Sequence, residues 1–153
     1  MISLKYRAEL EDGLKRTKNL FDRALAAADL RDKVSRAYYA CYHAMIMAIY
    51  LEQPYNRDTN ASSHRIARET YVSLFSKTRA KKGQGIQIYR HKSVDINTEA
   101  EKWKRLRESA DYDILTNHFE PLLLASTQDM LGNMLKFAED HIDFVRSHLK
   151  ENP

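Results

Sequence analysis

The residues from Asp32 to Leu51 form the most hydrophobic stretch of the chain, and almost every position from Ala37 onward is apolar or aromatic. This apolar surface is wider than the single stripe of an amphipathic helix, and the run is too short and too interrupted by Tyr and His to span a membrane. A helix of this kind lies in the middle of a soluble bundle. The stretch therefore predicts a central helix that ends near Glu52, because Pro54 cannot continue it.

Apolar residues also recur at three- and four-residue spacing in four further segments, which predict four more helices. The expected helices run from Ser3 to about Ala28, from Asp32 to near Glu52, from Ser62 or Ser63 to about Lys77, from Asn97 through Ile114 and from Ser126 to about Leu149. The expected inner positions are Leu10, Leu14, Phe21, Leu25 and Ala28 in the first helix; Ile66, Ala67, Thr70, Tyr71, Leu74 and Phe75 in the third; Ala100, Trp103, Leu106, Ala110 and Ile114 in the fourth; and Leu131, Met134, Leu135, Ala138, Ile142, Val145 and Leu149 in the last. No run of alternating residues predicts a strand. The prediction is a single all-α domain over residues 1–153, an antiparallel up-and-down bundle of about five helices.

Composition agrees with one folded domain. The chain has 153 residues, 30 % of them charged, which suffices for a full core and a solvated surface. The net charge of +4 permits an anionic partner without identifying one. The single cysteine, Cys41, falls inside the apolar helix, so we expect no disulfides and a reducing, cytoplasmic setting. The N-terminal residues, charged from Lys5 onward, give no signal segment, and no membrane association is expected.

Several kinds of catalytic chemistry lack their motifs. No Gly-rich nucleotide fingerprint, HExxH, paired-cysteine, EF-hand or G-x-S-x-G motif occurs. The six histidines are scattered without ligand partners at helical spacing. The sequence therefore predicts neither a metal nor another cofactor.

The first candidate site lies on the central helix, where Arg36, Tyr39 and His43 share one face at i, i+3 and i+7. An Arg can bind phosphate, a His can transfer protons near neutral pH, and a Tyr can donate a hydrogen bond. The alternative is that each group is satisfied inside the bundle, with Arg36 paired to an acid. We expect this face to turn toward the helix that carries Arg107.

Two further groups of candidates lie on other helices. His64 opens the third helix, where it could present its ring at the end of the bundle or be an ordinary surface residue. Arg107 and Asp111 are spaced for an ion pair within the fourth helix, and Tyr112 could reach a neighbouring helix with its hydroxyl.

The segment from Arg79 to Asp95 breaks the helical period and is basic. Lys81, Lys82, Arg90 and Lys92, with Tyr89 among them, could grip a phosphate backbone and stack a base. A solvated run of charge is the alternative reading.

Two stretches resemble a known family. SRAYYACYHAM (Ser35–Met45) resembles the S-R-A-Y-Y-A-x-x-H-A signature of small HEPN-domain proteins, and RESADYD (Arg107–Asp113) resembles their R-x-x-A-D-Y element. His64 stands where family members have a Thr-His or Ser-His opening the third helix. The resemblance covers about Leu4 to Leu149. It implies a helical bundle that usually forms a homodimer, and in many members a metal-independent ribonuclease paired with a nucleotidyltransferase-like antitoxin.

The ribonuclease members carry an Arg on the later helix, then four to six intervening residues, and then a His. In this chain the corresponding positions after Arg107 hold Tyr112, Asp113 and Ile114.

The resemblance therefore leads to two hypotheses. One is a toxin or antiviral-defence protein that acts on RNA as a metal-independent endoribonuclease, or a diverged relative, with Arg36, His43, Arg107 and Asp111 as catalytic residues and Tyr39, His64 and Tyr112 as substrate-binding residues. The other is a module without catalysis that binds a nucleotide or works with a nucleotidyltransferase-like protein. A third hypothesis is a scaffold whose polar residues lock the dimer.

Overall fold

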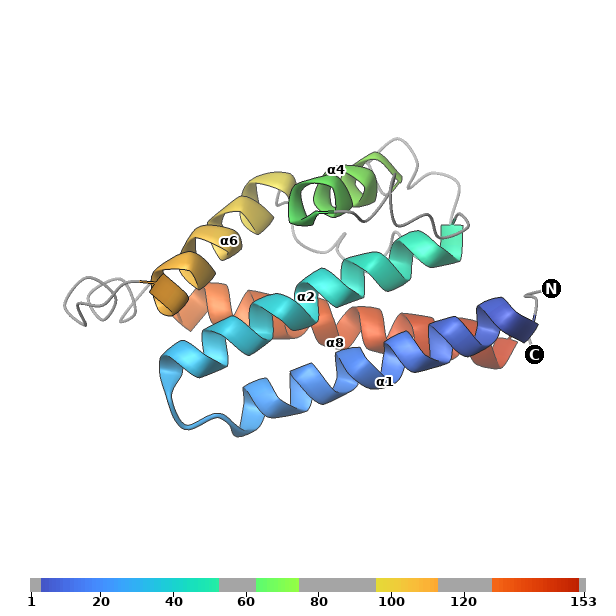
Figure 1. Ribbon diagram of the computed structural model, residues 1–153, viewed down its shortest axis with the longest axis horizontal. Helices are drawn as coiled ribbons and strands as arrows, with labels where there is room; N and C mark the ends of the chain where they lie inside the picture. The colour runs from blue at the N-terminus through green and yellow to red at the C-terminus, as the bar shows by residue number, and fades with distance from the viewer. Residues whose placement is uncertain (1–3, 53–62, 75–95, 113–127, 152–153) are drawn as a thin grey trace.

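The computed structural model describes residues 4–52, 63–74, 96–112 and 128–151, which form five α-helices and no strand (Figure 1). The helices are α1 (Leu4–Ala26), α2 (Leu30–Glu52), α4 (His64–Leu74), α6 (Ile96–Tyr112) and α8 (Gln128–Glu151). This confirms the expected all-α bundle of about five helices. None of the five helices has the combination of length and apolar composition that a membrane span requires. The basic segment 79–95 and the connection 113–127 lie outside the described residues.

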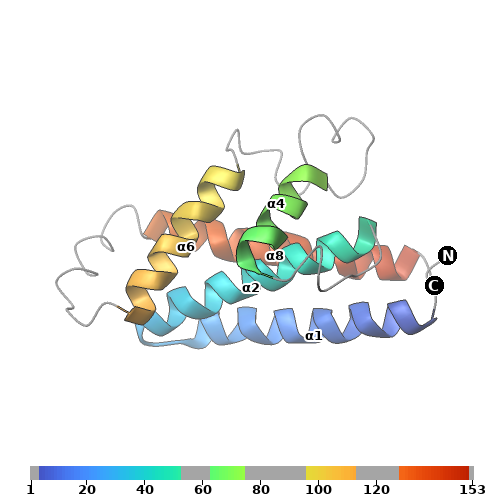
Figure 2. The same ribbon diagram turned by 45° about the horizontal axis from the view of Figure 1, so that its top comes forward.

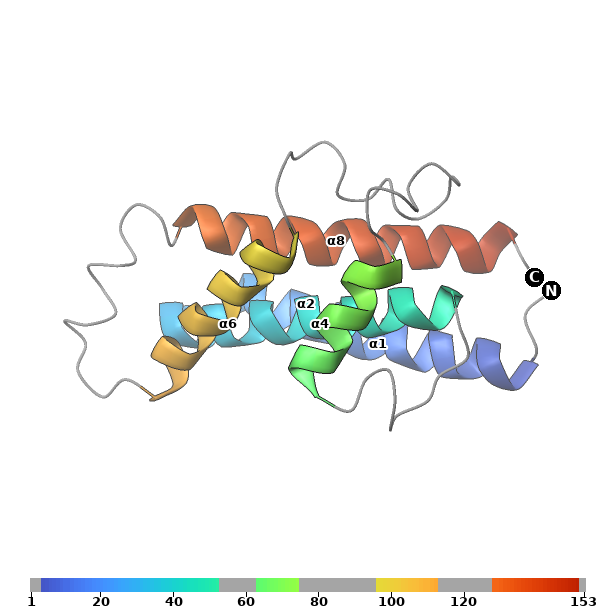
Figure 3. The same cartoon turned by 90° about the horizontal axis from the view of Figure 1, so that it is seen from above.

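The three long helices, α1, α2 and α8, lie side by side, and the two shorter helices, α4 and α6, lie across α2 (Figures 2 and 3). α2 packs against each of the other four, as its wide apolar surface predicts. α1 runs antiparallel to α2 as expected. The strict alternation of direction does not extend to the end of the chain, because α8 runs in the same direction as α2 (Figure 1).

Small side chains allow the neighbours of α2 to approach closely. Four alanines of this helix are completely buried: Ala37, Ala40, Ala44 and Ala48. Because interaxial distance depends on the side chains at the crossing, alanines favour close helix contacts. The thiol of Cys41 donates to the Met134 carbonyl of α8 at 3.0 Å, so even the lone cysteine of this helix has a structural role.

Near the C-terminal end of α1, the buried positions are not the ones predicted. Leu10, Thr17 and Ala24 are completely buried and recur every seven residues, which is the spacing of helices that pack in a bundle. Leu25 falls one residue beyond this register and is 51 % exposed. The helix ends at Ala26, so Ala28 lies in the turn and is exposed. The expectation that Leu25 and Ala28 are core residues is therefore wrong.

Elsewhere the predicted inner positions are buried with few exceptions. In α6 they are Ala100, Trp103, Leu106 and Ala110; in α8, Leu131, Met134, Ala138, Ile142, Val145 and Leu149. Leu135 is only half-buried, as are Ile66, Thr70 and Leu74 of α4, whose buried residues are Ala67 and Tyr71. Phe75 and Ile114 lie outside the described residues.

A buried hydrogen bond between side chains ties α4 to α8. His141 has no exposed surface, and its Nδ1 lies 2.7 Å from the carbonyl oxygen of Phe137 while its Nε2 lies 2.6 Å from the hydroxyl of Tyr71. A carbonyl oxygen only accepts, so Nδ1 carries the proton and Tyr71 donates to Nε2. The Phe137 ring stacks on the imidazole at 3.9 Å. Burial lowers the pKa of His141 to about 4, although the Phe137 carbonyl and Asp140 favour its charged form.

We predict that His141 makes the fold sensitive to acid. Above the usual pKa of 6.5 the ring is neutral in both the folded and the unfolded chain. Between pH 6.5 and 4 only the unfolded chain binds the proton, so the free energy of unfolding falls as pH falls, by about 3 kcal/mol in total. Urea unfolding at pH 7 and pH 4 should show this loss in the wild type and not in His141→Gln, which keeps polar atoms but does not titrate. An equal loss in both proteins contradicts the prediction.

Candidate functional site

Three tyrosines of α2 meet α4 and α6. Tyr38 is 7 % exposed, whereas Tyr39 and Tyr42 are half-buried. Tyr38 and Tyr42 are four residues apart, so their rings lie one above the other on the same face of the helix. With His64 of α4 and Arg107 of α6 they form a group that we call the Tyr–His–Arg cluster.

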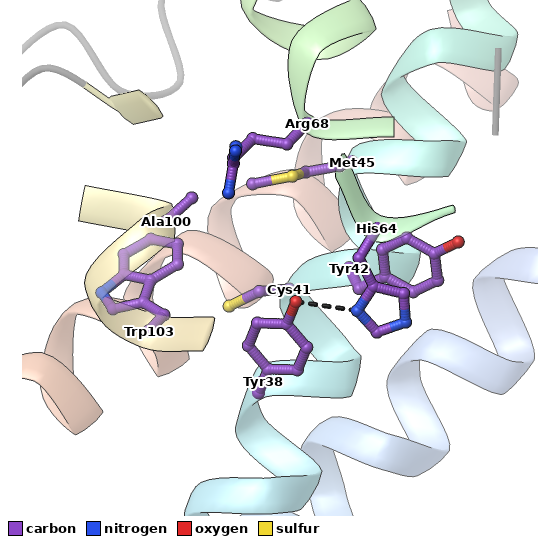
Figure 4. Close-up of a pocket in the computed structure, with 8 residues that line it drawn as sticks. All are labelled: Tyr38, Cys41, Tyr42, Met45, His64, Arg68, Ala100 and Trp103. Carbon is purple, nitrogen blue, oxygen red and sulfur yellow. Dashed lines mark hydrogen bonds between the residues drawn. The ribbon is translucent and has the colours of Figure 1, made fainter. Parts of the chain in front are cut away.

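Local sequence fixes the position of His64. The Ser63 hydroxyl accepts a hydrogen bond from the Ile66 amide at 3.1 Å, so Ser63 caps α4, one of the two caps expected. His64 is then the first helical residue. Its Nδ1 shares a hydrogen bond of 2.8 Å with the Tyr38 hydroxyl, and its ring stacks on Tyr42 with centroids 4.0 Å apart (Figure 4). The imidazole is thus held by one hydrogen bond and one stacked ring.

Burial lowers the pKa of His64 below its usual 6.5, and the charges of Arg107, Lys104 and His43 lower it further. Each of these causes disfavours the imidazolium. The ring is therefore neutral at pH 7 and can accept a proton.

Arg107 supplies a buried cation beside this ring. Its side chain is 8 % exposed, and its guanidinium lies over the rings of Tyr38, at 5.2 Å, and Tyr39, at 5.7 Å. It also pairs with Asp111 at 3.4 Å. Arg31 of α2 donates to the Ala110 carbonyl at 3.2 Å and so holds the end of α6 that carries this pair. Aromatic faces stabilise a cation that has lost much of its hydration.

The Tyr38 hydroxyl stays protonated in this setting. Burial raises its pKa to about 12, even though the charge of Arg107 favours the phenolate. It can therefore donate to or accept from His64, but it does not supply a negative charge.

The structure thus brings together Tyr39, His64, Arg107 and Asp111 from three helices. Arg36 instead bonds to Asp32 of its own helix at 2.9 Å, which is the structural alternative considered for it. His43 lies at the edge of the cluster: its ring contacts Tyr42 at 5.7 Å, and burial together with Arg16 of α1 lowers its pKa. Of the three candidates on α2, Tyr39 is the one whose side chain contacts Arg107. Arg36 and His43 have the other contacts described above.

One candidate cannot be placed, and two residues of the cluster were not anticipated. Tyr112 is the last residue of α6, and its side chain lies outside the described part of the chain. Tyr38 and Tyr42 were not among the candidate residues. Both belong to the SRAYYACYHAM stretch, and their four-residue spacing was a signal that could have identified them.

A small cavity opens next to the cluster, between α2, α4 and α6. Its volume is about 20 Å³, room for about one water molecule. The lining residues are Tyr38, Cys41, Tyr42, Met45, His64, Arg68, Ala100 and Trp103 (Figure 4). The lining is mostly aromatic and apolar, and among the described lining residues only Arg68, which pairs with Glu101, carries a permanent charge.

Comparisons of the chain with protein-family models, with curated proteins and with solved structures found no match. Within the described ranges no three His, Cys, Asp or Glu side chains are grouped to hold a metal ion. The cluster itself supplies a neutral imidazole, a protonated phenol and a guanidinium held against aromatic rings.

We predict that the pKa of His64 reports on the charge of Arg107. Arg107→Gln removes a nearby positive charge and should raise the pKa of His64, because the imidazolium is no longer repelled. NMR titration of the His64 ring in both proteins measures the shift. Arg105→Gln is the matched control, since it removes the same charge from an exposed position of α6 and should leave the titration unchanged. An unchanged or lower pKa in Arg107→Gln contradicts the arrangement.

Proposed function

We propose that this chain is a HEPN-type protein that acts on RNA as a metal-independent endoribonuclease, or as a diverged relative of one. The observation that carries the proposal is the neutral imidazole of His64 beside the buried guanidinium of Arg107. Cleavage of RNA by its own 2′-hydroxyl needs a base and a cation that stabilises the charged transition state. The resemblance of SRAYYACYHAM and RESADYD to HEPN motifs supports the same class.

In this proposal His64 is the base. Its Nδ1 donates to the Tyr38 oxygen, so that Nε2 is free to accept the proton of a ribose 2′-hydroxyl. The 2′ oxygen then bonds to the adjacent phosphorus and the bond from phosphorus to the 5′ oxygen breaks. The leaving oxygen takes a proton from water, and a 2′,3′-cyclic phosphate remains. Arg107 stabilises the extra negative charge on the phosphoryl oxygens.

This assignment moves the acid–base role from the HEPN position after Arg107 to His64. Asp111 is a positioning residue that orients the guanidinium, and Tyr39 covers it. The proposal includes the cytoplasmic setting, the homodimer and the nucleotidyltransferase-like antitoxin that the resemblance implies. In the scaffold hypothesis the same polar residues would instead hold the dimer.

The alternative function is nucleotide or partner binding without cleavage. One observation favours it: the cavity beside His64 has a volume of only about 20 Å³. A ribose and its phosphate do not fit into this space unless side chains of the cluster move. Binding at the surface of the cluster requires no such movement.

We predict that the purified protein cleaves RNA in the presence of EDTA. His64→Asn should lower the rate by about 100-fold or more, the usual contribution of a general base. Because the pKa of His64 lies below 6.5, the wild-type rate should rise with pH below that value and level off near neutrality. Gel analysis of the products measures the rate at each pH. An assay of the 3′ ends for cyclic phosphate identifies the product. His148→Asn, on α8, is the control and should retain the wild-type rate.

RNA that stays intact at high protein concentration contradicts the enzyme proposal. Calorimetry with nucleotides and with 2′-O-methylated RNA then tests the alternative, since binding without cleavage produces heat with one of these ligands. If none of these ligands produces heat, the binding alternative is also wrong and the scaffold hypothesis is the one that remains. In that hypothesis Arg107→Gln changes the oligomeric state.

A further inference from the structure

A second hollow lies at the surface between α4 and α6, and Arg68 lines both it and the small cavity. Its volume is about 300 Å³, and Arg68, Thr98, Glu101, Lys102 and Arg105 line it. We call it the α4–α6 groove. It is large enough for about ten water molecules, and therefore for a phosphate group.

The groove is positively charged. Three cationic side chains face one carboxylate, a net charge of +2. Glu101 is already engaged by Arg68 and lies 3.8 Å from Arg105, so its charge is shared between two guanidiniums. Lys102 is exposed and has no ion-pair partner among the described residues. Thr98 lies in the first turn of α6, at the end of a helix where the backbone dipole favours anions.

Arg68, which lines this groove, carries one buried donor that the described residues leave unsatisfied. Its side chain is 15 % exposed, and its Nη1 bonds to Glu101, while its buried Nε has no hydrogen-bond partner among the described residues. A buried N–H without an acceptor destabilises the fold, and most buried polar groups in proteins have a partner. The exposed part of the guanidinium, and not this buried Nε, is what a ligand in the groove would meet.

We propose that the α4–α6 groove binds a phosphate group, with Arg68 as the inner donor and Lys102 and Arg105 at the rim. A guanidinium offers several N–H groups in one plane, which suits the oxygens of a phosphate. The identification of the phosphate as part of RNA or of a nucleotide rests on the proposed function. The site itself is distinct from His64 and Arg107 and requires no cleavage.

Arg68 connects the groove to the Tyr–His–Arg cluster. It lies four residues after His64, one turn along the same helix, and lines both the cavity and the groove. Its charge also acts on the Tyr38 hydroxyl, as does that of Arg107. A nucleic-acid strand could therefore place one phosphate in the groove and a neighbouring one at the cluster. The groove then fixes the register in which the strand lies.

The proposal is tested by binding, with cleavage prevented. The probes are a short 2′-O-methylated single-stranded RNA and adenosine monophosphate, titrated into the full chain at several salt concentrations. Lys102→Ala/Arg105→Ala removes two exposed charges, so it should fold normally, as circular dichroism and thermal unfolding will show. Loss of the contact with this one phosphate should weaken RNA binding about fivefold near 0.1 M salt and reduce the slope of log K against log salt by about 0.7.

The matched control is Lys136→Ala/Arg146→Ala, which removes the same charge from exposed positions of α8. It should leave affinity and slope unchanged. A loss confined to the RNA assigns the groove to a strand, and a loss that includes adenosine monophosphate assigns it to a terminal phosphate. Unchanged binding of both probes to Lys102→Ala/Arg105→Ala, or an equal loss in the control, overturns the proposal.

Failure of the groove and failure of the enzyme proposal are distinguishable. His64→Asn removes the proposed base and keeps the groove, so adding Lys102→Ala/Arg105→Ala to this variant should still weaken its binding of the 2′-O-methylated RNA. If the protein binds RNA through Lys102 and Arg105 but cleaves none, the groove proposal is supported and the enzyme proposal is wrong. If the protein cleaves RNA through His64 and its binding does not depend on Lys102 and Arg105, the enzyme proposal is supported and the groove proposal is wrong.

Discussion

Enclosure of α2 by four other helices is the constraint on which the rest of the structure depends. Burial of apolar surface drives this arrangement, and four completely buried alanines let the neighbouring helices approach. The polar groups of such a helix must find partners inside the bundle. Tyr38 does so through His64 of α4 and Arg107 of α6. The candidate site is therefore a product of the packing, because it forms where two short helices cover the tyrosines of the central one.

The electrostatics of the cluster follow from the same enclosure. Burial disfavours the charged forms of both His64 and Tyr38. Arg107, whose charge cannot be removed at any ordinary pH, stays ionised and is stabilised by aromatic faces and Asp111. The cluster thus combines one ion pair, Arg107 with Asp111, with two groups that burial keeps neutral.

The sequence predicted the elements better than their contacts. The central position of α2 followed from the width of its apolar surface, and the inner stripe of α8 followed from its period. The burial of His141 was not predicted, because a histidine counts as polar until a partner such as Tyr71 is known. Arg36 could have been assigned from sequence alone, since Asp32 lies one turn before it. The placement of His64 and Arg107 against the same tyrosine, Tyr38, could not be predicted, because it depends on how three helices cross.

Arg7, near the start of α1, donates to the carbonyl of Leu149, near the end of α8, across 142 positions of sequence. Closing so long a loop has a high entropic cost, so contacts of this kind form late in folding. The pairing of α1 with α2 needs only neighbouring segments and can form as soon as both have left the ribosome. During synthesis, the α1–α2 hairpin therefore exposes the apolar surface that α8 covers in the folded protein until α8 has also left the ribosome.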